Sequence, residues 1–436
     1  QLGRAWLWVF RSQADTSDDP LIFDYLDGLI FDLVTHSELQ DRRVDLVVVD
    51  NPTINAFAVP GGVIGIHTGL LLHAQPEDEL ATVIAHEIAR LSQRHFSRRL
   101  EFAKSRQPLT MAAMLAGFVL MATAGSNAGM AALTAAQAAA QDSALRYSRG
   151  NEAEADRVGM QTMVAAGRDP HAAASMFERM LQASRFATGS RVPEFLRTHP
   201  LSETRIADTR NRARQYPKKI RPANLDYLLM RARVRNQLAG SPVEAIERFT
   251  KELSGTPTSA TAARYGLVLA LTDAGRTDEA ALELDSLWAK QPDRLEYMIA
   301  DAKIKMARGD AEDAAKAMEA ALRLRPNNHP LTITYAEALM QSQQPHIAEE
   351  VLLKHSREKP NDPYVWYLLA EVQGLSGNII GLHQARAEYF ILNGVLDQAE
   401  KQLRYALDLQ SSDYTTNAKI TQRLRDIGRM REVLEG

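Results

Sequence analysis

The distribution of apolar residues in the first half of the chain predicts a small sheet followed by helices. Residues 44–49 (VDLVVV) form a β-branched run that ends at the turn signal of residues 50–52 (DNP), and they predict a strand. Residues 55–59 and 63–66 predict two further strands on either side of a Pro-Gly-Gly turn. From Glu77 the period changes, and apolar residues recur at helical spacing: Leu80, Val83, Ile84, Ile88 and Leu91.

The second half of the chain repeats every 34–35 residues. Glycines mark this interval, and a glutamine takes one of their places: Gly240, Gly275, Gly309, Gln343 and Gly377. Alanines and prolines keep the same interval: Ala245, Ala280, Ala314, Ala348, Pro257, Pro292, Pro326 and Pro360. A turn residue inside each helix pair, a small residue where the helices approach and a terminal proline are typical of the tetratricopeptide repeat. The pattern predicts a solenoid with a concave protein-binding surface.

These two patterns predict two domains, residues 1–218 and 222–436, joined by a linker at residues 218–222 (KKIRP). An apolar stretch at residues 110–124 is shorter than the roughly 20 residues that cross a bilayer. Together with the Ala-rich residues 130–141 it predicts a helical hairpin. The hairpin is either packed inside a soluble domain or serves as a lid or a peripheral membrane contact beside an active site.

Charge and cysteine content narrow the chemistry. The chain has 51 Lys and Arg residues against 54 Asp and Glu residues, a net charge of −3, so it has no overall basic field and nucleic acid is excluded as a main partner. It contains no cysteine, which excludes disulfides, thiolate metal sites and cysteine nucleophiles. Any metal would therefore rest on His and carboxylate ligands.

The predicted helix that begins at Glu77 carries the candidate chemistry. Glu87 falls at the edge of the apolar stripe, where a carboxylate must be paired or put to use. His86 and residue 90 lie four positions apart on an adjacent face. In zinc-peptidase helices, two His residues at this spacing bind Zn²⁺ and the intervening Glu polarises a metal-bound water. Here residue 90 is Arg90, whose guanidinium has no free lone pair and cannot bind Zn²⁺.

Four motifs in order give the chain a family resemblance. They are residues 55–62 (NAFAVPGG), 85–90 (AHEIAR), 151–156 (NEAEAD) and 198–206 (THPLSETRI). Over about residues 20–215 the chain resembles the zinc metallopeptidases related to HtpX and the CAAX prenyl protease. With its C-terminal repeats it resembles the periplasmic members that act in outer-membrane protein assembly. The resemblance implies an α+β, zincin-like metallopeptidase domain, mostly helical with a small sheet, followed by an all-α tetratricopeptide solenoid.

The resemblance also implies roles for single residues. Glu87 would be the catalytic general base for one zinc ion, with His86 and Glu152 as ligands and Arg90 at the position of the second ligand His. Asp156 would orient a ligating His from the second shell of residues around the metal. His199 would be a possible fourth ligand that keeps the site latent, although a lone His before Pro is equally a capping or surface residue. A substrate would add as a strand along the edge formed by Asn55, Ala56, Phe57, Ala58 and Val59.

The expected function is a periplasmic zinc metalloendopeptidase and chaperone-like factor that acts on unfolded, stalled or misassembled outer-membrane β-barrel proteins. The repeats would bind this substrate or the barrel-assembly machinery. Arg90 has three alternative consequences: zinc is lost and Arg90 pairs with Glu152 or Glu87, a weakened ion remains without water activation, or the chain is an inactive form of an active enzyme. Each predicts little or no proteolysis. A non-catalytic tetratricopeptide chaperone or adaptor for outer-membrane protein assembly is the alternative function, and a membrane-surface protease is a third.

Overall fold

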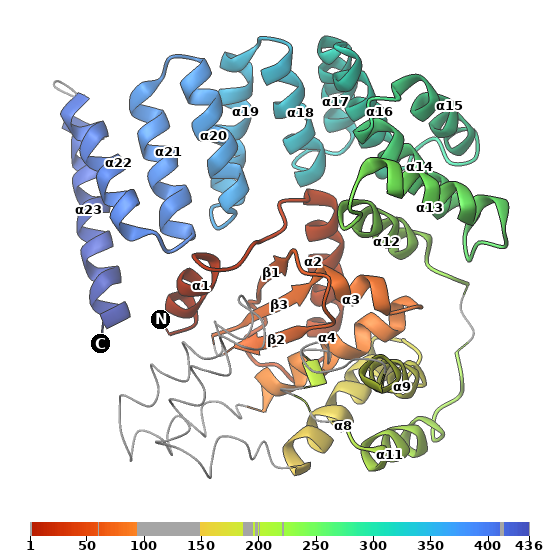
Figure 1. Ribbon diagram of the computed structural model, residues 1–436. Coiled ribbons are helices and arrows are strands. Elements are labelled where there is room, and N and C mark those ends of the chain that lie inside the picture. Colours follow the sequence, from red (N-terminus) through yellow and green to blue (C-terminus); the bar gives the residue numbers. More distant parts are fainter. Residues whose placement is uncertain are drawn as a thin grey trace. The chain divides into compact units, whose positions relative to one another are not determined.

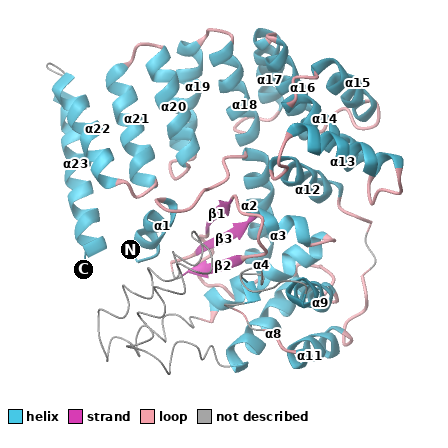
Figure 2. Ribbon diagram, in the orientation of Figure 1, coloured by secondary structure: helices cyan, strands magenta, loops and turns pink. Residues whose placement is uncertain are grey.

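A computed structural model describes residues 2–59, 61–93, 149–185, 195–196, 199, 201–219, 222–409 and 414–435. The chain divides into two compact units (Figures 1 and 2). The first unit contains Gln1–Ser17 and Tyr25–Tyr227, and the second unit contains Asp18–Asp24 and Leu228–Gly436. A seven-residue segment near the N-terminus therefore packs with the C-terminal half of the chain.

The first unit is built on a three-stranded sheet of β1 (Asp45–Val49), β2 (Ala56–Val59) and β3 (Val63–His67). The order is β1-β3-β2, with β1 parallel and β2 antiparallel to β3. The three predicted strands are confirmed to within one residue at each end. β2 lies at an edge of this sheet, as expected for residues 55–59, although Asn55 itself precedes the strand.

Helices cover the sheet and supply the rest of the first unit (Figure 1). Their bounds are α1 Leu2–Arg11, α2 Pro20–Thr35, α3 Thr68–His73, α4 Glu77–Ser92, α8 Arg149–Ala165, α9 Ala172–Arg185 and α11 Glu203–Ala213. One core cluster joins Trp6, Leu7 and Phe10 of α1 to Val47 and Val49 of β1 and to Val59 and Val63. The mostly helical α+β class is thereby confirmed.

Helix α4 is buried along almost its whole length, from Glu79 to Ala89. It packs against β2 and against α8 and α9. Gly159 of α8 makes the closest approach, because a Cβ there would lie 3.1 Å from the backbone of Ala85 and His86. The absence of a side chain at this position lets the two helices that carry the candidate site approach each other.

The second unit is a row of antiparallel helix pairs (Figure 1). Their bounds are α12 Leu225–Gln237, α13 Pro242–Ser254, α14 Ala260–Asp273, α15 Thr277–Trp288, α16 Leu295–Arg308, α17 Ala311–Leu324, α18 His329–Gln341, α19 Pro345–Glu358, α20 Pro363–Leu375, α21 Ile379–Leu392, α22 Leu396–Leu409 and α23 Tyr414–Glu435. The all-α repeat architecture expected from the 34-residue interval is confirmed.

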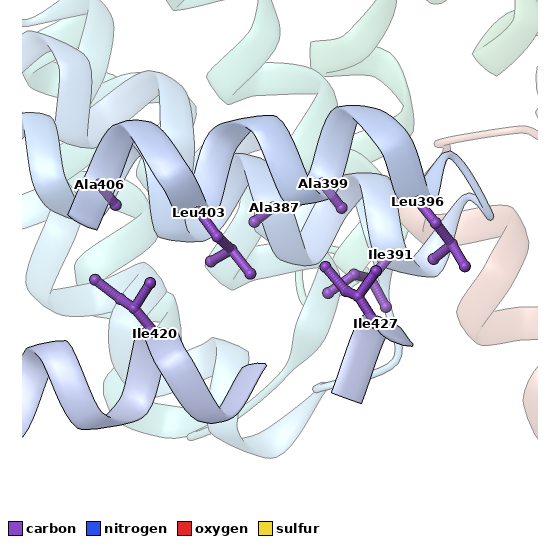
Figure 3. Packing of buried hydrophobic residues seen from close by; sticks show 8 residues of the cluster. All are labelled: Ala387, Ile391, Leu396, Ala399, Leu403, Ala406, Ile420 and Ile427. Atoms are coloured by element: carbon purple, nitrogen blue, oxygen red, sulfur yellow. The ribbon is translucent and has the colours of Figure 1, made fainter. Parts of the chain in front are cut away.

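The turn positions of the repeats behave as the sequence predicts. Gly275, Gly309 and Gly377 have φ angles of 71°, 91° and 79°, in the left-handed region that ends helices. Gln343, which takes the place of a glycine, adopts the same conformation with φ 59°. Ala280, Ala314 and Ala348, which follow Gly275, Gly309 and Gln343 by five residues, are buried, and they allow the two helices of each pair to approach. At the C-terminal end, α21, α22 and α23 share a separate apolar cluster (Figure 3), which contains Ala387, Ile391, Leu396, Ala399, Leu403, Ala406, Ile420 and Ile427.

The hairpin predicted over residues 110–141 lies outside the described residues, and its role as a lid or membrane contact stays a prediction. Within the described ranges, no helix has the length and apolar character needed to cross a membrane.

Replacing Gly159 by Ala should destabilise the first unit by about 1–3 kcal/mol, because the added methyl group overpacks the contact between α4 and α8. Gly28→Ala is the matched control. Gly28 is an exposed helical glycine with no atom within 4 Å of the added Cβ, so this change should leave stability unchanged or raise it. Thermal unfolding of both variants checks the difference. Equal melting temperatures would contradict the close approach.

Candidate metal centre

Two buried helices and one short segment bring the candidate site together. Helix α4 contributes His86 and Glu87, which are 2% and 0% exposed. Helix α8 presents Glu152 and Asp156, which lie one turn apart on one face. His199, 1% exposed, follows the short segment that begins at Phe195. Residues more than 100 positions apart in the sequence therefore meet in one buried place.

Three of these residues form a group with the chemistry of a metal site: His86, Glu152 and His199. His199 Nδ1 lies 3.3 Å from His86 Nε2 and 3.0 Å from Glu152 Oε2, and His86 Nε2 lies 3.5 Å from Glu152 Oε2. A tetrahedral ion with metal–ligand bonds of about 2.0–2.1 Å separates its ligand atoms by about 3.3 Å. The donor types and their spacing therefore fit a zinc-sized cation.

An unsatisfied oxygen supports this fit. Glu152 Oε1 is buried and has no hydrogen-bond partner among the described residues. A buried carboxylate oxygen without a partner is costly unless a cation or a water satisfies it. The group is thus incomplete as a set of protein side chains alone.

Asp156 and Arg205 fix the orientation of His86 and Glu152. Asp156 Oδ1 lies 2.9 Å from His86 Nδ1, so His86 donates to Asp156 through Nδ1 and the ring is held with Nε2 facing Glu152 and His199. Arg205, on α11, donates to both oxygens of Asp156 at 2.8 Å and lies 3.1 Å from Glu152 Oε2. One guanidinium therefore fixes the two carboxylates that α8 contributes to the site, Glu152 and Asp156.

These contacts shift the pKa values of the buried groups. Burial alone would lower the pKa of His86, but the hydrogen bonds with Asp156 and Glu152 outweigh it and raise the pKa to about 9. Burial alone would raise the pKa values of Glu152 and Asp156. The two histidines lower the pKa of Glu152, and His86 and Arg205 lower that of Asp156. Both carboxylates are therefore held in the charged form.

Arg90 lies against the same group from the other side. Its Nη1 donates to Glu87 Oε2 and to His199 Nε2, each at 3.0 Å. A nitrogen that accepts from a guanidinium carries no proton, so neutral His199 is protonated on Nδ1, which donates to Glu152. Burial and the Arg90 charge both lower the pKa of His199. Arg90 thus favours the tautomer whose Nδ1 is unable to bind a metal.

Two residues that contact the group are absent from the site roles assigned in the sequence analysis. Phe195 stacks on the His199 ring with centroids 4.3 Å apart and 15° between the planes. Its backbone nitrogen donates to Ile54 O, just before β2. Arg205 is the other, and its only sequence signal is its place in the 198–206 motif. A single Phe near a His gives no signal of its own.

Comparisons with known proteins agree with this geometry. Residues 20–213 match the family described as Peptidase family M48, and residues 305–372 match a tetratricopeptide repeat family. The chain is 34% identical over 406 residues, 92% of its length, to the beta-barrel assembly-enhancing protease of Escherichia coli K12, of which 81% is covered. The chain belongs to peptidase family M48. The family resemblance deduced from the four motifs is therefore confirmed.

Two further relatives match different shares of the chain. The beta-barrel assembly-enhancing protease of Yersinia pestis is 33% identical over 400 residues, which cover 91% of this chain and 82% of the relative. The mitochondrial metalloendopeptidase OMA1 of Schizosaccharomyces pombe is 31% identical over 190 residues, which cover 42% of this chain and 50% of the relative. The similarity to the Yersinia pestis protease therefore extends into the repeats, whereas the similarity to OMA1 covers less than half of this chain.

Asp156→Asn should lower the free energy of unfolding of the protein by about 3–5 kcal/mol, because it breaks the buried ion pair between Asp156 and Arg205. Asp41→Asn is the matched control. Asp41 binds both Nε and Nη2 of Arg43 in the same way as Asp156 binds Arg205, but both partners are exposed, so the loss should be small. Urea unfolding of the two variants provides the comparison. Similar losses would refute the role assigned to burial.

Proposed function

We propose that this chain is a zinc metalloendopeptidase and chaperone-like factor that acts on misassembled outer-membrane β-barrel proteins in the periplasm. We further propose that Arg90 impairs its peptidase activity. Membership of family M48 and relatives named beta-barrel assembly-enhancing protease support the reaction and the substrate class, and the compartment follows from the resemblance carried by the four motifs. The repeats of the second unit support a role in binding clients or the assembly machinery. The observation that carries the proposal is the convergence of His86, Glu152 and His199 beside Glu87, with Arg90 donating to the same group.

Each residue has a definite task in the peptidase reaction of the family. His86, Glu152 and His199 would hold one zinc ion, which supplies an activated water and polarises the substrate carbonyl. Asp156 holds the His86 ring through Nδ1. Glu87 would accept the proton of the attacking water through its carboxylate. The edge strand, β2 with Asn55 before it, pairs with an extended substrate as an additional strand.

Arg90 interferes with two of these tasks. Glu87 Oε2 already accepts a hydrogen bond from Arg90, so this oxygen is not free to accept a proton from water. The guanidinium charge opposes a second cation in the same buried place, and it holds His199 in the tautomer whose Nδ1 donates to Glu152. Of the three expected consequences of Arg90, this arrangement favours loss of zinc with Arg90 paired to Glu87.

The same contacts favour a second candidate function. A chain whose base and ligand are both engaged by Arg90 acts as a non-catalytic chaperone or adaptor through its repeats. The two candidates differ in one measurable property. If the chain is an impaired peptidase, replacing Arg90 by His restores proteolysis. If it is an adaptor whose metal site has also lost function at other residues, the same replacement does not.

Arg90→His should bind about one zinc ion per chain and cleave casein, because the new imidazole adds a ligand and frees Glu87 and His199. The chain with Arg90 should bind little zinc and show little cleavage. Metal analysis and a casein assay on both proteins measure the two effects. Arg90→Gln is the matched control, since it removes the charge without adding a ligand, and it should not gain proteolysis.

Adding Glu87→Gln to Arg90→His should keep zinc bound and reduce cleavage by about 10²–10⁴-fold, the usual contribution of a general base. Stoichiometric zinc and equal cleavage in the chain with Arg90 and in the Arg90→His variant would refute the impairment.

A further inference from the structure

The seven residues Asp18–Asp24 (DDPLIFD) bind to the second unit as a short peptide would. Asp19 anchors them with both carboxylate oxygens. Its Oδ1 caps α2 by accepting from the backbone nitrogens of Leu21 and Ile22 at 3.0 and 3.2 Å, with Pro20 as the first helical residue. Its Oδ2 accepts from Arg233 Nε and Nη2 at 3.0 and 2.5 Å and from Gln237 Nε2 at 2.6 Å.

The receptor for Asp19 is held in place by neighbouring repeats. Arg233 and Gln237 lie one turn apart on α12. Arg233 Nη1 donates to the hydroxyl of Tyr265 on α14 at 2.9 Å, and the fully buried Tyr265 ring lies 6.0 Å from that of Tyr297 on α16. The side chains of Arg233 and Asp19 are 15% and 5% exposed, so a charged guanidinium edge faces a carboxylate away from bulk water.

Further contacts come from distant repeats. The Phe23 ring lies 6.4 Å from the imidazole of His329 on α18, at an angle of 65°. Asp18 lies near Asp362, the residue that caps α20. The segment therefore contacts helices from several repeats.

Asp18 weakens the binding of the segment Asp18–Asp24 to the second unit. Burial, followed by the neighbouring charge of Asp362, raises the pKa of Asp18 to about 6. Near pH 7.5 the ionised carboxylate is thus held in an unfavourable place. Asp19 is bound by three donor nitrogens of two residues, Arg233 and Gln237, while the preceding Asp18 opposes binding, and this balance leaves room for a competitor.

We propose that Arg233, Gln237 and Tyr265 form a carboxylate-binding site of the second unit, which Asp19 fills in the resting chain and from which a partner protein displaces it. The partner presents a segment of the same chemistry: an acidic N-cap followed by proline and an apolar helical turn. The local concentration of a tethered ligand is on the order of millimolar, so the competitor binds more tightly than Asp18–Asp24 or arrives at high local concentration. The site is separate from the candidate metal centre, and the proposal holds whether or not that centre is active.

A fluorescent peptide of residues 15–27 tests the site on the full chain. Anisotropy should show at least tenfold tighter binding to the Asp19→Asn chain than to the unaltered chain, because the substitution weakens the internal ligand and leaves the receptor intact. The same peptide carrying Asp19→Asn should not bind. Asp18→Asn is the matched control at the adjacent position. It relieves repulsion with Asp362, so this chain should bind the peptide no better than the unaltered chain.

Two further measurements separate release of the segment from misfolding. Amide hydrogen exchange at residues 21–24 should be faster in the Asp19→Asn chain and unchanged or slower in the Asp18→Asn chain. Arg233→Met added to Asp19→Asn should abolish peptide binding, which places the peptide on the proposed receptor. Gln237→Leu added to Asp19→Asn removes one donor of the receptor, and as a milder variant it should weaken peptide binding less than Arg233→Met does. Equal binding to the Asp19→Asn and unaltered chains, or binding that survives Arg233→Met, would overturn the proposal.

Discussion

Three carboxylates, of Glu87, Glu152 and Asp156, lie buried with the guanidinium groups of Arg90 and Arg205 around two histidines. Charges in a protein interior are tolerated only when they are paired and hydrogen-bonded, and this requirement determines how the surrounding elements are placed. Helix α8 must approach α4 closely enough for Asp156 to reach His86, which Gly159 permits. Helix α11 must bring Arg205 to Glu152 and Asp156 of α8. The position of each of these helices therefore follows from the pairing of buried charge.

Local periodicity explains why much of the fold was predictable from the sequence. The β-branched runs predicted the three strands, and the 34-residue interval predicted the helix pairs and the turn position of Gln343, whose left-handed conformation the structure adds. The strand order β1-β3-β2 was not predictable in this way, because pairing between strands is a long-range property that no single window of sequence contains. Nor was the packing of Asp18–Asp24 with the second unit, since seven residues are too few to show a period.

In the candidate site too, helical spacing predicted some features, while others depend on contacts between distant residues. The position of Glu87 at the edge of the helical stripe indicated a buried carboxylate, and it is fully buried. The helical spacing also placed Arg90 beside the functional face. Which partner Arg90 takes depends on side chains from other elements, and the contacts with Glu87 and His199 required the folded chain. Arg205 and Phe195 contribute through geometry alone, because their residue types occur throughout the chain without such a role.

The contact between Asp19 and Arg233 also sets an order of events during synthesis. The two residues are 214 positions apart. At about 5–20 residues per second, roughly 10–40 s pass between the appearance of the carboxylate and that of its partner. During this interval Asp19 Oδ1 has its local role as the cap of α2, while Oδ2 has no guanidinium to bind. The last half of the chain is therefore not a self-contained product of late translation, because its folded form includes a residue made 214 positions before Arg233.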